Sequence, residues 1–515
     1  MKKPCTTALA VLLCLGALVS CGTDGSTPAV TDDTAADTVV TTAETEPEIT
    51  SGNPAGLDLG GETIHLWYTP GWDSYTDIAG AQSGDVLDAA VYAQNLAVQE
   101  KLNCVIDFQD PGVAQADCTT AISTMLLADD TSYDVFCPTQ WSGVKLIPQG
   151  LFLNIVDMPY ISFDAAWWDL AYMQEMSMGQ NQLYALVGDA TIDRMRYLSC
   201  VYYNKQLYQN LFDSADGLYQ TVLDGKWTYD AFKSISEAVY SDINGNSKAD
   251  EEDIIGTRLC WNQDIMALQF CTGVPLTERD ANNIPQLVAD SEKMIDVVNR
   301  LYNVAFETTG IVYGKEREPR ENEIASKQFI EDRSMFYFGQ LQSAEYLRDM
   351  KSDYGVIPTP KLDEAQEQYY SYVFEVMRFM ALPYNCQKSE AVCAMLEEMA
   401  FEGYQNVSPV YYETVIKNKY TRDDVSSQMI DLVRDGMLTD IARIHMSSWS
   451  SISCLVRDTL FFKKNRTIFP LNLKSRERRL KRAAKTLSQA SLKTHNTYNT
   501  CLTRRYLSVK GRCFL

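Results

Sequence analysis

The order of strand and helix patterns in the sequence predicts an α/β protein with two lobes. Short alternating or continuous apolar runs, typical of strands, are separated along the chain by longer segments with helical spacing. The first five segments run strand, helix, strand, helix, strand, an order that implies a parallel sheet covered on both faces. A chain of 515 residues is long enough to bury two separate cores.

The first five elements follow from the spacing of apolar residues. ETIHLWY at 62–68 alternates apolar and polar residues as a strand does, so His65 is expected to be a strand residue rather than a catalytic base. Asp85 can cap a helix over 86–102, because its carboxylate can accept the free N–H groups of the first turn. The next elements are expected at 104–108 (strand), 114–128 (helix) and 133–137 (strand).

The rest of the chain continues this alternation of short and long segments. Strands are expected at 183–188, 198–204, 254–260, 334–339, 354–358 and 371–382. Helices are expected at 229–240, 291–306, 388–402 and 426–436.

The N-terminus has the pattern of a secretory signal over residues 1–20. An apolar stretch of 12 residues at 8–19 is too short to span a membrane, and Ser20-Cys21 after it resembles the bacterial lipobox. Cys21 is therefore expected to carry a lipid. Residues 21–57 contain no aromatic residue and are rich in Thr, Asp and Glu, which predicts a lipidated acidic tether. We expect the protein to be lipid-anchored at the extracellular face of the cell membrane.

Composition and motifs exclude several classes of function. The net charge of −23 argues against nucleic acid as a partner. The 14 cysteines show no zinc-ligand spacing, and Cys104, Cys200 and Cys260 are expected to be small buried side chains. There is no GxSxG, HExxH, P-loop or GxGxxG motif, so we expect neither an enzyme nor a required cofactor.

Aromatic residues indicate a sugar-binding site. The chain has 8 Trp and 29 Tyr, and sugars pack their C–H faces on aromatic rings beside polar groups. Ligands of open α/β sheets bind beyond the carboxyl ends of strands. The candidates at such positions are Trp72, Trp141, Trp261, Asn262, Gln263, Gln340 and Gln342. Three other tryptophans precede helices and are expected to pack in the interior: Trp167, Trp168 and Trp227.

Residues 242–253 have the spacing of a calcium-binding loop. The oxygen ligands would come from Asp242, Asn244, Asn246, the Lys248 carbonyl, Asp250 and Asp253. Ser247 stands where such loops have Gly, and Asp253 stands where they have Glu, so binding should be weakened. A structural calcium site and a loop held by its own side chains both remain open.

Several segments, in this order, resemble the extracellular solute-binding proteins of ABC importers, the maltose-type family. They are DLGGETIHLWY, SYDVFCPTQWSGVKL and FDAAWWDLAYMQEMSMGQNQLYALVGDA, then YYNKQLYQNLF and DGKWTYDAFKSISEAV, then FIEDRSMFYFGQLQSAEYLRDM and DYGVIPTPK. The resemblance covers about 58–460. It implies a two-lobed periplasmic-binding-protein-like fold that closes around a solute, with hinge crossings near 180–192 and 370–383.

The resemblance and the aromatic residues together predict a function and a domain plan. Residues 58–465 would form a solute-binding domain that captures an oligosaccharide for the membrane subunits of an ABC importer. A surface-anchored enzyme such as a glycosidase and a cell-surface adhesion module are the alternatives. From Lys463 to Leu515 there are 15 lysines and arginines against one acid, Glu477. Residues 466–515 are therefore expected to be an atypical basic tail outside the fold, as a shifted reading frame after about Lys464 would produce. An arm that binds anionic wall polymer or membrane is the functional alternative.

Overall fold

The computed structural model of the protein describes most of the chain between residues 49 and 445. The described residues are 49–70, 78–177, 179–260, 263–288, 291–314, 321–347, 350–413 and 424–445. The chain divides into two compact units, Met1–Ile49 and Thr50–Leu515, and every element below belongs to the second. Within the described ranges no helix has both the length and the apolar character needed to cross a membrane. The predictions for Cys21 and for 466–515 lie outside the described residues.

The first sheet is the parallel sheet that the sequence predicts. Its strands are β1 (Glu62–Tyr68), β2 (Cys104–Gln109) and β3 (Val135–Cys137), in the order β2-β1-β3. They are connected by α1 (Val86–Leu102) and α2 (Cys118–Leu127). The Asp85 side chain accepts the N–H groups of Leu87 and Asp88, which confirms the predicted N-cap of α1.

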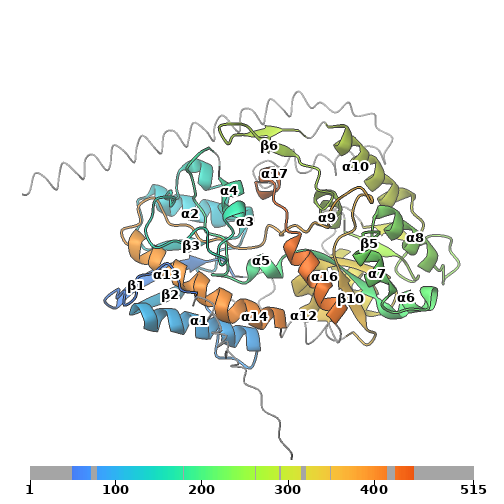
Figure 1. The fold of residues 1–515 in the computed structure, drawn as a ribbon, viewed down its shortest axis with the longest axis horizontal. Helices are drawn as coiled ribbons and strands as arrows, with labels where there is room; N and C mark the ends of the chain where they lie inside the picture. The colour runs from blue at the N-terminus through green and yellow to red at the C-terminus, as the bar shows by residue number, and fades with distance from the viewer. Residues whose placement is uncertain are drawn as a thin grey trace, which may run out of the picture. The chain divides into compact units, whose positions relative to one another are not determined.

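A helix from late in the chain completes the cover of this sheet. Figure 1 shows α13 (Ser389–Glu402) beside α1, and Gln94 of α1 donates to the Met399 carbonyl at 2.6 Å. Residues 51–53, at the end of the predicted tether, bind the same helix: Ser51 Oγ donates to the Glu398 carboxylate at 2.8 Å. The chain is therefore attached to α13 from residue 51, within the segment predicted to be a tether.

The second sheet is antiparallel and has the order β10-β4-β9. Its strands are β4 (Ser199–Asn204), β9 (Phe336–Gln340) and β10 (Tyr354–Ile357). All six residues of the central strand, β4, are buried, which explains its nearly continuous apolar sequence. Two smaller pairs lie outside this sheet: parallel β5 (Thr257–Leu259) with β8 (Ile311–Tyr313), and the hairpin β6 (Thr277–Arg279) with β7 (Pro285–Leu287).

The other described elements are helices, most of them short. They are α3 (Gln140–Gly143), η1 (Ile147–Gln149), α4 (Leu170–Met176), α5 (Asp193–Arg196), α6 (Lys205–Phe212), α7 (Gly217–Leu223), α8 (Tyr229–Val239), α9 (Gln263–Phe270), α10 (Glu292–Tyr302), η2 (Asn303–Glu307), α11 (Glu321–Ile330), η3 (Leu341–Ser343), α12 (Ala344–Leu347), η4 (Gly403–Val407), α14 (Ser408–Val410), α16 (Asp424–Asp435) and α17 (Ile441–Ile444). The predicted helices at 229–240, 291–306, 388–402 and 426–436 correspond to α8, α10 with η2, α13 and α16.

Two strand predictions, 183–188 and 371–382, are wrong. Both segments make only isolated bridges, including one between Leu186 and Met380. Residues of 371–382 pair in turn with Leu198, beside the second sheet, and with Phe136, in the first. The apolar run at 371–382 therefore reflects burial in a segment that runs from one sheet to the other, where no single neighbour extends a ladder. The strand at 254–260 is real but shorter, at Thr257–Leu259.

Candidate ligand-binding cavity

A cavity of about 750 Å³ lies between residues that follow strands of the first sheet, strand β9 of the second sheet, and the segment between the sheets. This volume falls within the range of small-molecule sites. Residues before α2 and in α3 form one wall, and α9, α11 and the segment from β9 to α12 form another. The lining residues are Gln115, Ala116, Trp141, Tyr197, Gln263, Asp264, Asn322, Glu323, Ser326, Tyr337, Phe338, Gly339, Gln340, Gln342, Ser343, Tyr346, Phe374, Glu375 and Val376.

The chain turns sharply after β9, and this turn places polar side chains at the cavity. The Gln340 N–H donates to Ser343 Oγ at 3.1 Å, so the end of the strand caps the short helix η3 that follows. Tyr346 Oη donates to the same Ser343 oxygen at 2.6 Å and lies 3.1 Å from Tyr337 Oη. The hydroxyl network holds the two aromatic rings of this wall together.

Trp141 is fixed to the segment between the sheets by its main chain. Its N–H donates to the Glu375 carbonyl at 2.9 Å, and the neighbouring Gln140 N–H donates to the Met377 carbonyl at 2.7 Å. The side chain is half-buried, and the Lys145 ammonium lies 5.0 Å from the ring centroid. This cation–π contact holds the indole at the wall of the cavity.

Phe374 and Glu375 line the cavity, and each contacts a further side chain behind it. The rings of Tyr372 and Phe374 stack with centroids 4.6 Å apart. Arg443 lies over Tyr372, 4.8 Å from its centroid, and pairs with the Glu375 carboxylate. Because Arg443 is buried and already holds Glu375, the charge of this cavity carboxylate is largely compensated.

Asp264 contributes a neutral carboxylic acid to the cavity wall. Burial raises its pKa to about 8, although the hydrogen bond from the Cys260 N–H, at 2.6 Å, acts in the opposite direction. The group is therefore mostly protonated at pH 7. Desolvation also raises the pKa of the buried Cys260 thiol well above its ordinary value, so it stays protonated and unreactive.

Four residues that the sequence predicted line this cavity: Trp141, Gln263, Gln340 and Gln342. Trp72, Trp261 and Asn262 lie outside the described residues. Sequence reasoning missed Tyr197, Asp264, Tyr346 and Phe374, which also line it. Asp264 and Tyr346 had a visible signal, since each follows shortly after the end of a predicted strand.

The predicted interior tryptophans and cysteines are buried. Trp167 and Trp168 both donate their indole N–H groups to the buried carboxylate of Glu397, and Trp227 donates to the Pro358 carbonyl. Cys104, Cys200 and Cys260 are buried and free, as expected. His65 lies on β1, with Nδ1 at 2.8 Å from Asp107 Oδ2, as a strand residue at the surface would.

The candidate calcium loop is closed by its own hydrogen bonds. Asp242 accepts the N–H groups of Gly245 and Ser247 at 2.7 and 2.8 Å, and Asn246 accepts that of Lys248 at 2.7 Å. Asp250 accepts from the amides of Asn244 and Asn246, and Asp253 accepts the N–H groups of Ile243 and Asp250. Ser247 adopts a left-handed φ of 60°, at the position where calcium loops have Gly. Within the described ranges, no cluster of three or more His, Cys, Asp or Glu side chains is placed to hold a metal ion. The loop stays a predicted calcium site.

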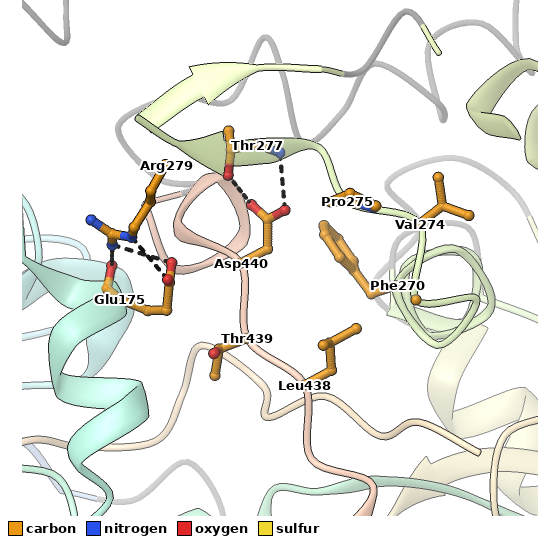
Figure 2. Close-up of a pocket in the computed structure, with 10 residues that line it drawn as sticks. Glu175, Phe270, Val274, Pro275, Thr277, Arg279, Leu438, Thr439 and Asp440 are labelled. Carbon is orange, nitrogen blue, oxygen red and sulfur yellow. Dashed lines mark hydrogen bonds and ion pairs between the residues drawn. The ribbon is translucent and has the colours of Figure 1, made fainter. Parts of the chain in front are cut away.

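A second cavity, of about 130 Å³, is below the size range of ligand sites (Figure 2). Four of its polar side chains are bound to one another in two pairs. Asp440 accepts from the Thr277 N–H and hydroxyl at 3.1 and 2.8 Å, and Arg279 donates to the Glu175 carboxylate at 2.9 Å. These bonds attach the hairpin β6–β7 to α4 and to the start of α17, so we assign this cavity a structural role.

Comparison with known proteins identifies the fold. No protein-family model matches the chain, and no curated protein sequence matches it. Among solved structures, a cyclo/maltodextrin-binding protein complexed with maltotetraose superposes with a TM-score of 0.51 at 11% identity, covering 86% of this chain and 98% of that one. An ABC transporter solute-binding protein from Thermotoga lettingae, bound with α-D-tagatose, gives a TM-score of 0.50 at 13% identity, covering 83% and 100%. The chain therefore has the two-lobed α/β fold of ABC solute-binding proteins, as the sequence predicted.

Proposed function

We propose that this protein is an extracellular solute-binding protein that captures an oligosaccharide and delivers it to an ABC importer. The cavity of about 750 Å³ carries the proposal. Aromatic rings (Trp141, Tyr337 and Tyr346 among them) stand beside the amide groups of several Gln and Asn side chains there. Flat apolar faces next to hydrogen-bonding groups suit sugar rings, which combine C–H faces with hydroxyl groups. Solved structures with this fold are bound to maltotetraose, an oligosaccharide, and to tagatose, a monosaccharide, which supports a sugar ligand.

Two carboxyl groups of the cavity already have partners within the protein, which we propose suits binding rather than hydrolysis. A glycosidase needs one ionised carboxylate and one acid, placed on either side of the bond to be cleaved. Glu375 is held by Arg443, and Asp264 accepts the N–H of Cys260 within the wall. We propose that both groups shape the site and that a bound glycan is released without being cleaved.

The N-terminal part of the proposal concerns location. Lipidation of Cys21 would anchor the protein at the extracellular face of the cell membrane, and the acidic segment that follows would hold the binding domain away from the anionic membrane surface. A structural calcium ion in the loop 242–253 is a further part of the proposal, with the role of fixing the chain after α8.

A thermal-shift screen tests the function. The protein without its signal is heated with each member of a panel of neutral oligosaccharides, and at least one should raise the melting temperature, because a ligand at 100 times its Kd adds about 2.7 kcal/mol of stability. Trp141→Ala should weaken that ligand's binding, whereas Phe212→Ala, which removes an exposed aromatic ring of α6, should not. Chromatography should recover the glycan intact. A panel without any shift, or a cleaved glycan, would reject the proposal.

A further inference from the structure

One hydrogen-bond acceptor in the cavity wall has no partner. Gln342 is 6% exposed, and its amide nitrogen donates to the Gln340 side-chain oxygen at 2.6 Å. Its own side-chain oxygen is buried without a hydrogen bond, and among the described lining residues it is the one side-chain oxygen or nitrogen in this state. A buried acceptor without a donor is costly, so this oxygen calls for a partner from outside the protein, either an ordered water or a ligand.

The bond between the two glutamines fixes what each one offers. Gln340 is held at the end of β9, where its main-chain N–H donates to Ser343 Oγ. Since the bond uses the oxygen of Gln340 and the nitrogen of Gln342, the pair retains the NH₂ group of Gln340 as a donor and the oxygen of Gln342 as an acceptor. The last torsion of a glutamine side chain is soft, so the carboxamide of Gln342 can turn toward the cavity that it lines.

The charges of the cavity restrict the ligand further. The described lining residues include no Lys, Arg or His, but they include the carboxyl groups of Asp264, Glu323 and Glu375. Lys145 reaches this region only through its contact with the Trp141 ring. An anionic sugar such as a uronate offers a carboxylate oxygen, which cannot donate to an acceptor and finds no positively charged side chain among the described lining residues to bind it.

We propose that Gln342 is the specificity-determining acceptor of this cavity, and that the ligand is an uncharged glycan that donates one hydroxyl to it. The inference rests on the proposed function and names the substrate class of the same site. A donor and an acceptor side by side match a sugar hydroxyl pair, since every hydroxyl can play either role. A site built to bind a hydroxyl discriminates strongly against an analogue that lacks it.

The first test compares charges and uses the wild-type protein. The neutral glycan that gives the largest shift in the screen is titrated by calorimetry beside its counterpart oxidised to a uronate. The uronate should bind at least about tenfold more weakly. Equal or tighter binding of the uronate would overturn the substrate class while leaving glycan capture intact, whereas the absence of any glycan ligand would reject the proposed function itself.

The second test identifies the residue. Gln342→Met keeps the size of the side chain and removes its acceptor, and should weaken the neutral glycan by about tenfold. The matched control is Gln206→Met, which changes an exposed glutamine on α6 and should leave affinity unchanged. The unliganded Gln342→Met protein should melt no lower than the wild type, because the substitution removes a buried acceptor without a partner. A lower melting temperature with unchanged affinity would show a structural role and overturn the assignment.

Singly deoxygenated forms of the glycan complete the test through a double-mutant cycle. One deoxy form should lose about tenfold in affinity for the wild type and almost nothing for Gln342→Met, because both changes remove the same hydrogen bond. If the losses in affinity caused by Gln342→Met and by each deoxy form were additive, the hydrogen bond between a glycan hydroxyl and Gln342 would be contradicted.

Discussion

The buried ion pair between Asp193 and Arg378 should be among the most sensitive points of the fold. Arg378 lies in the segment between the sheets, three residues from Glu375 of the cavity. Its Nε and Nη2 donate to the Asp193 carboxylate at 2.7 and 2.8 Å, and its main-chain N–H donates to the same group at 2.9 Å. Both side chains are at most 2% exposed. Burial alone would raise the pKa of Asp193, but attraction and hydrogen bonds from Arg378 outweigh it and hold the pKa below its ordinary value.

Arg378→Met keeps most of the side-chain volume but leaves the Asp193 carboxylate buried without its cation. Breaking such a pair costs about 3–5 kcal/mol, a large share of the roughly 5–15 kcal/mol that stabilises a typical domain. Urea unfolding at pH 7, followed by tryptophan fluorescence, measures the loss. The control is Arg300→Met. Arg300 pairs with Asp296 one helical turn away, and both side chains are over one-third exposed. The free energy of unfolding should therefore fall by less than about 0.5 kcal/mol in this variant.

The double variant Asp193→Asn with Arg378→Met separates the pair from the packing. Removing the stranded charge should restore part of the stability that Arg378→Met loses, giving a coupling energy above about 1 kcal/mol. Additive losses, or a cost for Arg378→Met no larger than that of Arg300→Met, would refute the reasoning.

Four further predictions concern titration, metal binding and export. Burial lowers the pKa of His445 to about 4, so at mildly acidic pH the proton binds the unfolded chain more tightly than the folded protein. Up to about 3 kcal/mol of stability should therefore be lost as pH falls from 6.5 to 4. A His445→Gln variant whose stability has the same pH dependence as the wild type would contradict this. Asp264 keeps its proton up to about pH 8 in the folded protein but loses it near pH 4 in the unfolded chain, so the stability of the protein should fall as pH rises between these values. Asp264→Asn should therefore be more stable than the wild type at pH 7, by about 4 kcal/mol at most. A less stable variant would count against a buried neutral acid. Calorimetry with millimolar calcium should show heat of binding that Asp242→Ala abolishes, and the absence of heat for the wild type would exclude the calcium site. Cys21→Ser should abolish lipid labelling in cells, and unchanged labelling would exclude Cys21 as the lipidated residue.

The sequence was most informative where one physical signal dominates. The first sheet was predictable because the sequence of β1 alternates apolar and polar residues over its first half, and because the Asp85 carboxylate marks the start of α1. It was misleading at 371–382, where continuous apolar residues suggested a strand. There the chain is buried by several neighbours in turn, and apolar content does not distinguish that burial from a ladder.

The candidate site shows the same division between local and tertiary signals. Trp141, Gln263 and Gln340 were predictable because each lies at or just beyond the end of a strand, where ligands of α/β sheets bind. The roles of Asp264 and Phe374 were not, because they depend on the packing of distant segments. The protonated state of Asp264 comes from burial, and the placement of Phe374 comes from stacking on Tyr372. Neither leaves a pattern in the local sequence.

The most direct test of the account is a crystal structure of the binding domain grown with the neutral glycan that the screen selects. We predict that the glycan occupies the cavity of about 750 Å³, with a ring against Trp141 and a hydroxyl within hydrogen-bonding distance of the Gln342 side-chain oxygen. A glycan bound elsewhere on the protein, with this cavity empty, would contradict the assignment of the site and the function built on it.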